Sequence, residues 1–174
     1  MSANIYFTSD THFGHGNIIR YCGRPFSSVE EMDEHLIKQW NEKIRDEDIV
    51  HHLGDFSIRC DRNILKRLRG EKFLISGSHD KLQSSNEDIW KEIVPQKMIR
   101  VNGKGIFLCH YAMRVWPESH YNSWHLYGHS HGRLPSHGWS LDVGVDTNAY
   151  CPYSMEDIMR KMKELKELGW VSRN

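Results

Sequence analysis

The sequence predicts an α/β protein built on one mixed β-sheet or on two sheets. In the first half of the chain, short apolar runs rich in β-forming residues alternate with helical patterns. This alternation is typical of strand–helix–strand units. In the second half the apolar runs follow one another more closely, as hairpins and neighbouring strands do. The two patterns together favour an α/β fold over an all-helical or all-β one.

The helix pattern is clearest between residues 28 and 45. Met32, Leu36, Trp40 and Ile44 recur at every fourth position, which places them on one face of an amphipathic helix. A shorter basic helix is expected to stop at Gly70. The elements expected in the first half are, in order, strand 4–8, helix 28–45, strand 48–53, helix 61–69 and strand 72–76.

In the second half a glycine-containing turn at residues 103–105 predicts a hairpin. The last helix is expected to begin at a Ser154 cap and to stop at Gly169. The elements expected here are hairpin strands 98–102 and 106–109, strands 123–127 and 139–145, and helix 154–168. Neither a repeat nor a linker interrupts the pattern, so the 174 residues are expected to form a single domain, 1–174.

Composition argues against one class of function and favours another. Lys plus Arg total 23 and Asp plus Glu total 23, so the formal charge is zero. This balance argues against a protein that holds nucleic acid or an anionic membrane by bulk electrostatics. Twelve histidines are present without a surplus of charge, which is typical of a metal site or a proton-transfer site.

The cysteines and the N-terminus give expectations about location. Cys22, Cys60, Cys109 and Cys151 contain no closely spaced pair, so free thiols are expected in place of a zinc ribbon or a redox dithiol. The first residues lack a basic segment followed by an apolar one, and no apolar run approaches about 20 residues. The default expectation is a cytoplasmic protein with no membrane partner.

Chemistry is concentrated where the expected strands end. In open α/β sheets a ligand binds beyond the carboxyl ends of the strands. Each polar break alone is explained as well by a turn or a helix cap. Taken together, the breaks form an Asp/His cluster large enough for two metal ions. The residues of this cluster are Asp10, His12, Asp55, His79, Asp80, His110, His129 and His131.

These residues fall into five ordered motifs: Asp10-x-His12, Gly54-Asp55, Gly77-Ser78-His79-Asp80, His110 and Gly128-His129-x-His131. The set resembles the motifs of the calcineurin-like metallophosphoesterases. Residues 141–146 also resemble a late strand of small, uncapped bacterial and phage-type members. The resemblance implies a four-layer αββα sandwich, with two mixed β-sheets flanked by helices and a two-metal centre at one edge of the sheets.

By the resemblance, each motif supplies ligands. Asp10, His12, Asp55 and His131 would hold the first metal ion, and Asp55 would bridge to a second ion that His110 and His129 also bind. Ser78 occupies the position where the family has an asparagine ligand. Because a serine hydroxyl is shorter than an asparagine amide and is a poor neutral ligand, we expect a water in the gap, a weaker second site or a rearranged loop.

The function implied is hydrolysis of a phosphodiester or nucleotide-type phosphoester by attack of a metal-bridged hydroxide. His79 is the expected general acid, and Asp80 is its expected orienting partner. The cofactors expected are two divalent ions, manganese first, with iron, zinc, nickel or cobalt as alternatives. The alternative functions are a catalytically weakened scaffold or binding protein and a one-metal variant, both suggested by Ser78.

Residues around the motifs are expected to contact substrate; a solvated side chain is the alternative for Arg24, and a self-packed loop is the alternative for the segment that contains Arg114. The expected contact residues are His15, Asn17, Arg24 and Arg114. The expected partner is a small phosphoester or nucleotide substrate, with RNA or DNA ends as an alternative, and the oligomeric state stays open. One of the strand residues His51 and His52 is expected to support a ligand.

Overall fold

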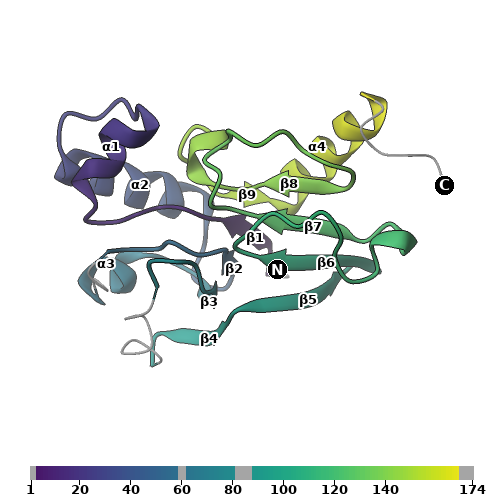
Figure 1. Cartoon of the computed structure of the whole chain (residues 1–174). Coiled ribbons are helices and arrows are strands. Elements are labelled where there is room, and N and C mark those ends of the chain that lie inside the picture. The colour runs from purple at the N-terminus through teal and green to yellow at the C-terminus, as the bar shows by residue number, and fades with distance from the viewer. Residues whose placement is uncertain (1–2, 59–61, 81–87, 169–174) are drawn as a thin grey trace.

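The structure is a computed structural model that describes residues 3–58, 62–80 and 88–168 (Figure 1). Its first sheet has the strand order β4-β3-β2-β1-β9. The four leading strands run parallel, and the last one pairs antiparallel with β1. Their bounds are β1 Ile5–Thr8, β2 Ile49–His52, β3 Glu71–Ile75, β4 Trp90–Val94 and β9 Tyr153–Ser154.

The second sheet has the order β5-β6-β7-β8. Its first two strands form an antiparallel hairpin, whereas β6, β7 and β8 are parallel. The bounds are β5 Gln96–Val101, β6 Lys104–Cys109, β7 Trp124–Tyr127 and β8 Ser140–Asp142. The predicted α/β class with two mixed sheets and helices is therefore confirmed.

Three helices cover the outer face of the first sheet: α1 Gly16–Cys22, α2 Val29–Lys43 and α3 Arg62–Arg67. Leu36 and Trp40 on α2 pack in one apolar cluster with Val50 and Leu74 of the sheet. The α2 helix begins where the Ser28 hydroxyl accepts a hydrogen bond from a backbone N–H in the first turn. The burial of this apolar face anchors the helices.

A second apolar cluster joins the two sheets. Phe7 and Ile75 of the first sheet pack with Leu108 and Leu126 of the second. Helix α4 Met155–Glu167 adds apolar side chains to the same cluster, and its N-terminus is fixed by a reciprocal capping box at Ser154. On the other face of the second sheet the segment after β6, not a helix, covers Phe107 and Cys109.

The elements that the sequence analysis did not predict are short. Helix α1 has seven residues that include Gly16, β4 carries charged residues in its middle, and β9 has only two residues. The strand expected over 139–145 is shorter and gives way to a 3₁₀ turn, Val145–Thr147. The helix expected over 61–69 is observed as α3, Arg62–Arg67. Its expected first residue, 61, lies outside the described residues, as does Cys60. Cys22, Cys109 and Cys151 are free, as predicted.

In the described part of the chain, no helix has the length and apolar character that crossing a membrane requires.

Candidate metal centre

The carboxyl ends of strands from both sheets meet at one edge, and the motif residues follow these ends. The connections there interlock through backbone hydrogen bonds. The Asp10 N–H donates to the Gly54 carbonyl at 2.9 Å, and the Gly128 N–H donates to the His110 carbonyl at 2.9 Å. A Cβ at Gly128 would lie 2.5 Å from an Asp10 carboxylate oxygen, so this position requires glycine.

The predicted ligands form two groups, each with ligand atoms within 4.8 Å of one another. The first group is Asp10, His12 and His131, and the second is Asp55, His110 and His129. The two groups are joined by Asp55, because its Oδ2 lies 3.7 Å from His12 Nε2 and 3.4 Å from His110 Nε2. They are also joined by Asp10, whose carboxylate accepts the His129 N–H at 2.9 Å.

Two buried imidazole nitrogens in these groups lack a hydrogen-bond partner: His12 Nε2 and His110 Nε2. His110 Nδ1 lies 2.7 Å from the Leu53 carbonyl, which can only accept, so Nδ1 is the donor. In the neutral ring this leaves a lone pair on Nε2, directed toward Asp55. Buried polar atoms are rarely left unpaired, and these two nitrogens both face Asp55 Oδ2, an arrangement that a bound cation would complete.

The backbone at the site is strained. Asp10, His12, Asp55, His129 and His131 all have positive φ, between 49° and 65°. Side-chain-bearing residues rarely adopt this left-handed conformation, which carries an energetic cost at each position. Its concentration at five predicted ligands indicates that the chain is bent there in order to place side chains, since a sequence under folding constraints alone would use glycine.

The electrostatics also favour a cation. Burial raises the pKa of Asp10 to about 7 and lowers the pKa of His12 to about 2. Burial alone would also raise the pKa of Asp55, but the nearby His110 ring and the hydrogen bond from the His79 N–H hold it below its usual range. The His12 ring is therefore neutral, with a free lone pair, and the carboxylates gain a counter-charge when a cation binds.

Ser78 lies at the second group but is directed at a carboxylate. Its hydroxyl lies 3.2 Å and 3.1 Å from the two Asp55 oxygens and donates to them. The His79 N–H donates to the same carboxylate at 2.9 Å. The loop of the third motif therefore fixes the orientation of Asp55.

His79 and Asp80 take separate roles. The His79 side chain is 44% exposed, and its Nε2 lies 4.0 Å from Asp55 Oδ2. Asp80 is buried and accepts three backbone N–H groups, those of Asp55, Phe56 and Gly77. The prediction that Asp80 orients the His79 ring is wrong, because its carboxylate is already used to tie two motif loops together.

The prediction that Arg24 contacts substrate is also wrong. Its side chain has no exposed area, and its guanidinium donates to the Asp10 and Thr11 carbonyls and, through Nε and Nη2, to both Asp146 oxygens at 2.8 Å. These contacts leave it unavailable to substrate. Asp146 in turn accepts from His131 Nδ1 at 2.7 Å. Arg24 is therefore a positioning residue for the first group.

The other predicted contacts surround the centre. His15 Nδ1 lies 3.3 Å from His12 Nδ1, and Asn17 is exposed in the first turn of α1. Arg114 is exposed and lines a cavity of about 370 Å³ beside the segment that follows His110. His52 Nε2 lies 3.0 Å from the Thr11 hydroxyl, so it contacts the loop of the first motif at a residue between two predicted ligands and not at a ligand itself.

Sequence reasoning did not assign Asp142 or Asp146. Asp142 accepts the N–H groups of Gly132 and Gly144, which fixes the loop that carries the last histidines. The signal that could have found both acids is their position in residues 141–146, at the end of a strand that resembles a family element.

The donor set fits divalent cations. The first group could hold one ion and the second another, with Asp55 shared, because both groups present carboxylate oxygens and imidazole nitrogens. Imidazole with carboxylate is a ligand mixture that suits manganese, iron, zinc, nickel or cobalt better than calcium.

Comparisons with known proteins agree with this geometry. The uncharacterized protein MJ1445 of Methanocaldococcus jannaschii is 36% identical over 184 residues, which cover 97% of this chain and 96% of the relative. The gene 66 protein of Mycobacterium phage D29 is 36% identical over 85 residues, which cover 45% of this chain and 41% of the relative.

Among solved structures, the protein of unknown function AQ665 from Aquifex aeolicus superposes with a TM-score of 0.73 and 26% identity, covering 92% of this chain and 100% of its own. Residues 4–139 match the calcineurin-like phosphoesterase superfamily domain. The chain therefore belongs to the calcineurin-like phosphoesterase superfamily.

Proposed function

We propose that the protein is a phosphodiesterase that works with two divalent cations, manganese first among the candidates. Asp10, His12, His131 and Asp55 would hold one cation, and Asp55, His110 and His129 the other. The observation that carries this proposal is the pair of unpartnered, buried Nε2 atoms of His12 and His110, which face one Asp55 oxygen from opposite groups. A carboxylate between two such nitrogens could supply a ligand to each of two cations.

Two divalent cations bound there would lower the pKa of water and offset the negative charge that develops on a phosphoryl group. The chain itself supplies orientation. The Leu53 carbonyl and Asp146 hold the Nδ1–H groups of His110 and His131, so each ring presents Nε2 to the centre.

His79 is the residue placed to move a proton. Its exposed ring lies at the mouth of the centre, with centroids 5.3 Å from His12 and 6.0 Å from His15. A protonated Nε2 there can donate to the leaving oxygen of a phosphoester bound between the metal-binding groups. Asp55 Oδ2 lies 4.0 Å from His79 Nε2, so the ring is beside the carboxylate that the two groups share.

The preference for a diester is supported by space beside the second group. The cavity of about 370 Å³ is lined by Met113, Arg114 and Leu134, and also by Tyr127, two residues before His129. A phosphodiester has a second esterified group that such a cavity would receive, whereas a monoester has none.

The test is metal content measured together with hydrolysis of bis-p-nitrophenyl phosphate and p-nitrophenyl phosphate. The manganese-loaded protein should contain two equivalents and favour the diester. His110→Ala should lose one equivalent and most of the activity, whereas His120→Ala, an exposed histidine in the turn Ser119–Tyr121, should change neither.

Three other results would contradict different parts of this proposal. One equivalent in the wild type would favour the one-metal variant. Two equivalents without turnover of either ester would favour a binding protein. Faster turnover of the monoester would overturn the diester assignment.

A further inference from the structure

The arginines of this protein differ in whether a carboxylate neutralises them. Most of those in the described part of the chain have a carboxylate oxygen within 4.0 Å: Arg24, Arg45, Arg62, Arg67, Arg69, Arg100 and Arg160. Arg20, Arg114 and Arg133 are exposed and have no such partner among the described residues. An exposed arginine that keeps its full charge is available to a phosphate.

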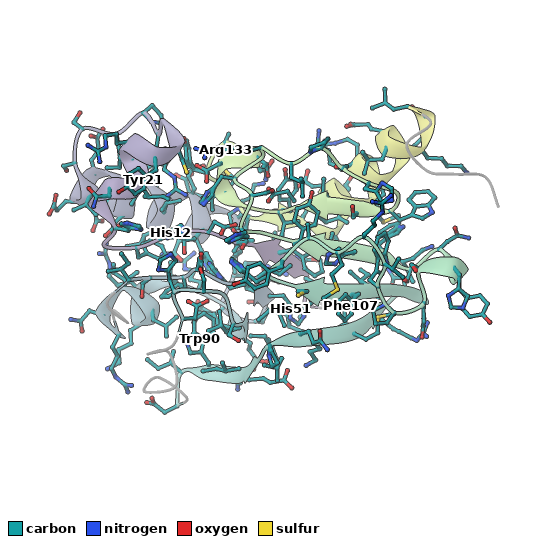
Figure 2. All side chains as sticks on the ribbon, in the orientation of Figure 1. His12, Tyr21, His51, Trp90, Phe107 and Arg133 are labelled. Carbon is teal, nitrogen blue, oxygen red and sulfur yellow. The ribbon has the colours of Figure 1, made fainter. Side chains whose placement is uncertain are left out.

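Two of these arginines meet on one flank of the metal centre. Arg133 follows His131 by two residues, and its Nη2 donates to the Tyr21 carbonyl on α1. Arg20 lies over the Tyr21 ring, 5.4 Å from its centroid. Tyr21 is 55% exposed, and its ring faces His15 at 6.4 Å. Figure 2 shows His12, Tyr21 and Arg133 in one region of the molecule.

The third arginine, Arg114, is near the second metal-binding group, in the segment that follows His110. The Tyr111 ring lies 4.8 Å from the His110 ring and 4.9 Å from the His129 ring, and 47% of this residue is exposed. Arg114, three residues further on, lines the cavity with Leu134. Each flank of the centre therefore presents an exposed tyrosine and at least one arginine without a carboxylate.

We propose that the substrate is a short single-stranded nucleic acid, cleaved at an internal phosphodiester. This inference rests on the proposed function. A strand carries a phosphate and a base on both sides of the scissile bond, which matches arginine and tyrosine on both flanks. A simple diester or a mononucleotide carries its charge at the centre only and leaves one flank without a contact. The zero net charge of the chain agrees with a short strand, because a protein that holds a long duplex needs many cationic side chains.

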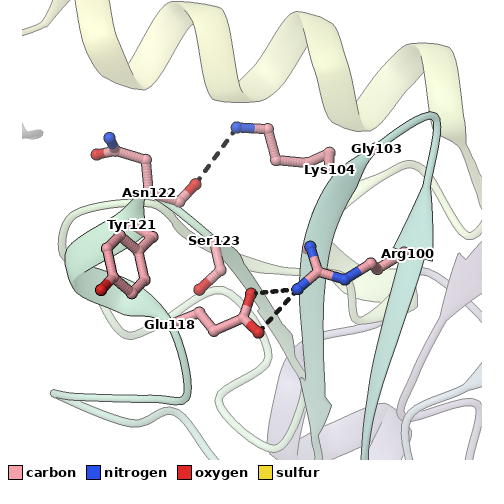
Figure 3. Close-up of a pocket in the computed structure, with 8 residues that line it drawn as sticks. Arg100, Gly103, Lys104, Glu118, Tyr121, Asn122 and Ser123 are labelled. Atoms are coloured by element: carbon pink, nitrogen blue, oxygen red, sulfur yellow. Dashed lines mark hydrogen bonds and ion pairs between the residues drawn. The ribbon is translucent and has the colours of Figure 1, made fainter.

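Arg100 provides a matched control. Arg100 lines a second, separate cavity with Lys104 and Glu118, at the end of β6 opposite to His110. One of its guanidinium nitrogens donates to both Glu118 carboxylate oxygens at 2.8 Å (Figure 3). It is exposed like Arg114 and Arg133, but its charge is already compensated and it lies outside the metal centre.

The kinetic test uses the manganese-loaded protein and four substrates: bis-p-nitrophenyl phosphate, the p-nitrophenyl ester of thymidine 5′-monophosphate, and single-stranded pentanucleotides of dT and of U. We expect kcat/KM for at least one pentanucleotide to exceed that of both p-nitrophenyl esters by about tenfold. R114A and R133A should each lower the ratio of pentanucleotide to bis-p-nitrophenyl phosphate kcat/KM by about tenfold, and R100A should leave this ratio unchanged.

A binding measurement separates this inference from the proposed function. The anisotropy of fluorescein-labelled dT pentanucleotide and U pentanucleotide in EDTA reports the strand site without catalysis. The Kd should rise about tenfold in R114A and R133A, but not in R100A. Bis-p-nitrophenyl phosphate hydrolysis together with arginine-insensitive strand binding would overturn the strand inference and leave the phosphodiesterase. Equal kcat/KM for the thymidine ester and the pentanucleotides would also overturn it. Arginine-dependent binding without hydrolysis of any substrate would overturn the phosphodiesterase and keep the strand site.

Discussion

Asp146 accepts the Nδ1–H of His131 at 2.7 Å. The same carboxylate receives Nε and Nη2 of the buried Arg24 at 2.8 Å each, and Arg24 reaches on to the Asp10 carbonyl. The contact thus fixes the ring of one predicted ligand and the backbone of another. Such outer partners orient ligands and raise their basicity.

Asp146→Asn is expected to weaken the first metal site. The amide cannot accept from both Arg24 and His131 as the carboxylate does, so the affinity for Mn²⁺ should fall by about 10–100-fold. Competition with a fluorescent chelator measures this affinity. Asp88→Asn, which removes an exposed carboxylate paired with Arg62, is the control and should leave the affinity unchanged. An equal change in both variants would contradict the positioning role.

His79→Ala should keep the bound metal and lose turnover. A positioned general acid contributes about 10²–10⁴-fold, mainly where the leaving group is a poor one. We therefore expect a large loss with an alkyl ester of thymidine 5′-monophosphate and a smaller loss with the p-nitrophenyl ester, since p-nitrophenolate leaves without protonation. Equal losses with both esters, or an unchanged rate with the alkyl ester, would exclude the general-acid role.

Ser78→Asn is expected to strengthen the second metal site. An asparagine amide oxygen reaches further than the serine hydroxyl, which donates to Asp55. The affinity for the second Mn²⁺ and kcat for bis-p-nitrophenyl phosphate should both rise, whereas Ser78→Ala should raise neither. If the asparagine variant shows no gain in either quantity, the serine is an adapted feature of this protein.

Asp48 links stability to pH. Burial alone would raise its pKa, but hydrogen bonds from Arg45 and from the Asn4 N–H hold the pKa below the ordinary 3.8. Because the folded pKa is the lower one, the ionised carboxylate stabilises the fold above pH 3.8, and this stabilisation is lost as the pH falls through the folded value. Asp48→Asn should lower the free energy of unfolding at pH 7 by about 1–3 kcal/mol and by less at pH 3.

Urea unfolding at the two pH values measures this difference. Glu47→Gln removes the exposed acid that also contacts Arg45 at 3.0 Å and serves as the control for the loss of one negative charge. The same pH dependence in the wild type and in the Asp48 variant would show that another group carries the effect.

The sequence predicts the parts of the fold that repeat a strong pattern. The spacing of Met32, Leu36 and Trp40 predicts α2 to within two residues at each end, because one apolar face must be buried. Helix α1 escapes prediction, because seven residues that begin with glycine and asparagine carry little helical signal. It is formed by packing of Ile18 onto the first sheet, which is a tertiary effect.

The candidate site is likewise predictable from the sequence only in part. Ordered motifs at strand ends predict which residues gather, and the two groups contain Asp10, His12, Asp55, His110, His129 and His131. The sequence does not predict how Asp80 and Arg24 are used. Each has several donors or acceptors within reach, and only the closed loops decide that Asp80 binds three N–H groups and that Arg24 turns inward.

Each metal-binding group takes ligands from both sheets. Asp10 and Asp55 follow strands of the first sheet, whereas His110, His129 and His131 follow strands of the second. A cation in either group would therefore act as a cross-link between the two halves of the sandwich and would slow their separation. A partly folded chain with only one sheet formed has neither group complete, so activity would appear only after the last docking step of folding and would be the first property lost when the sheets part.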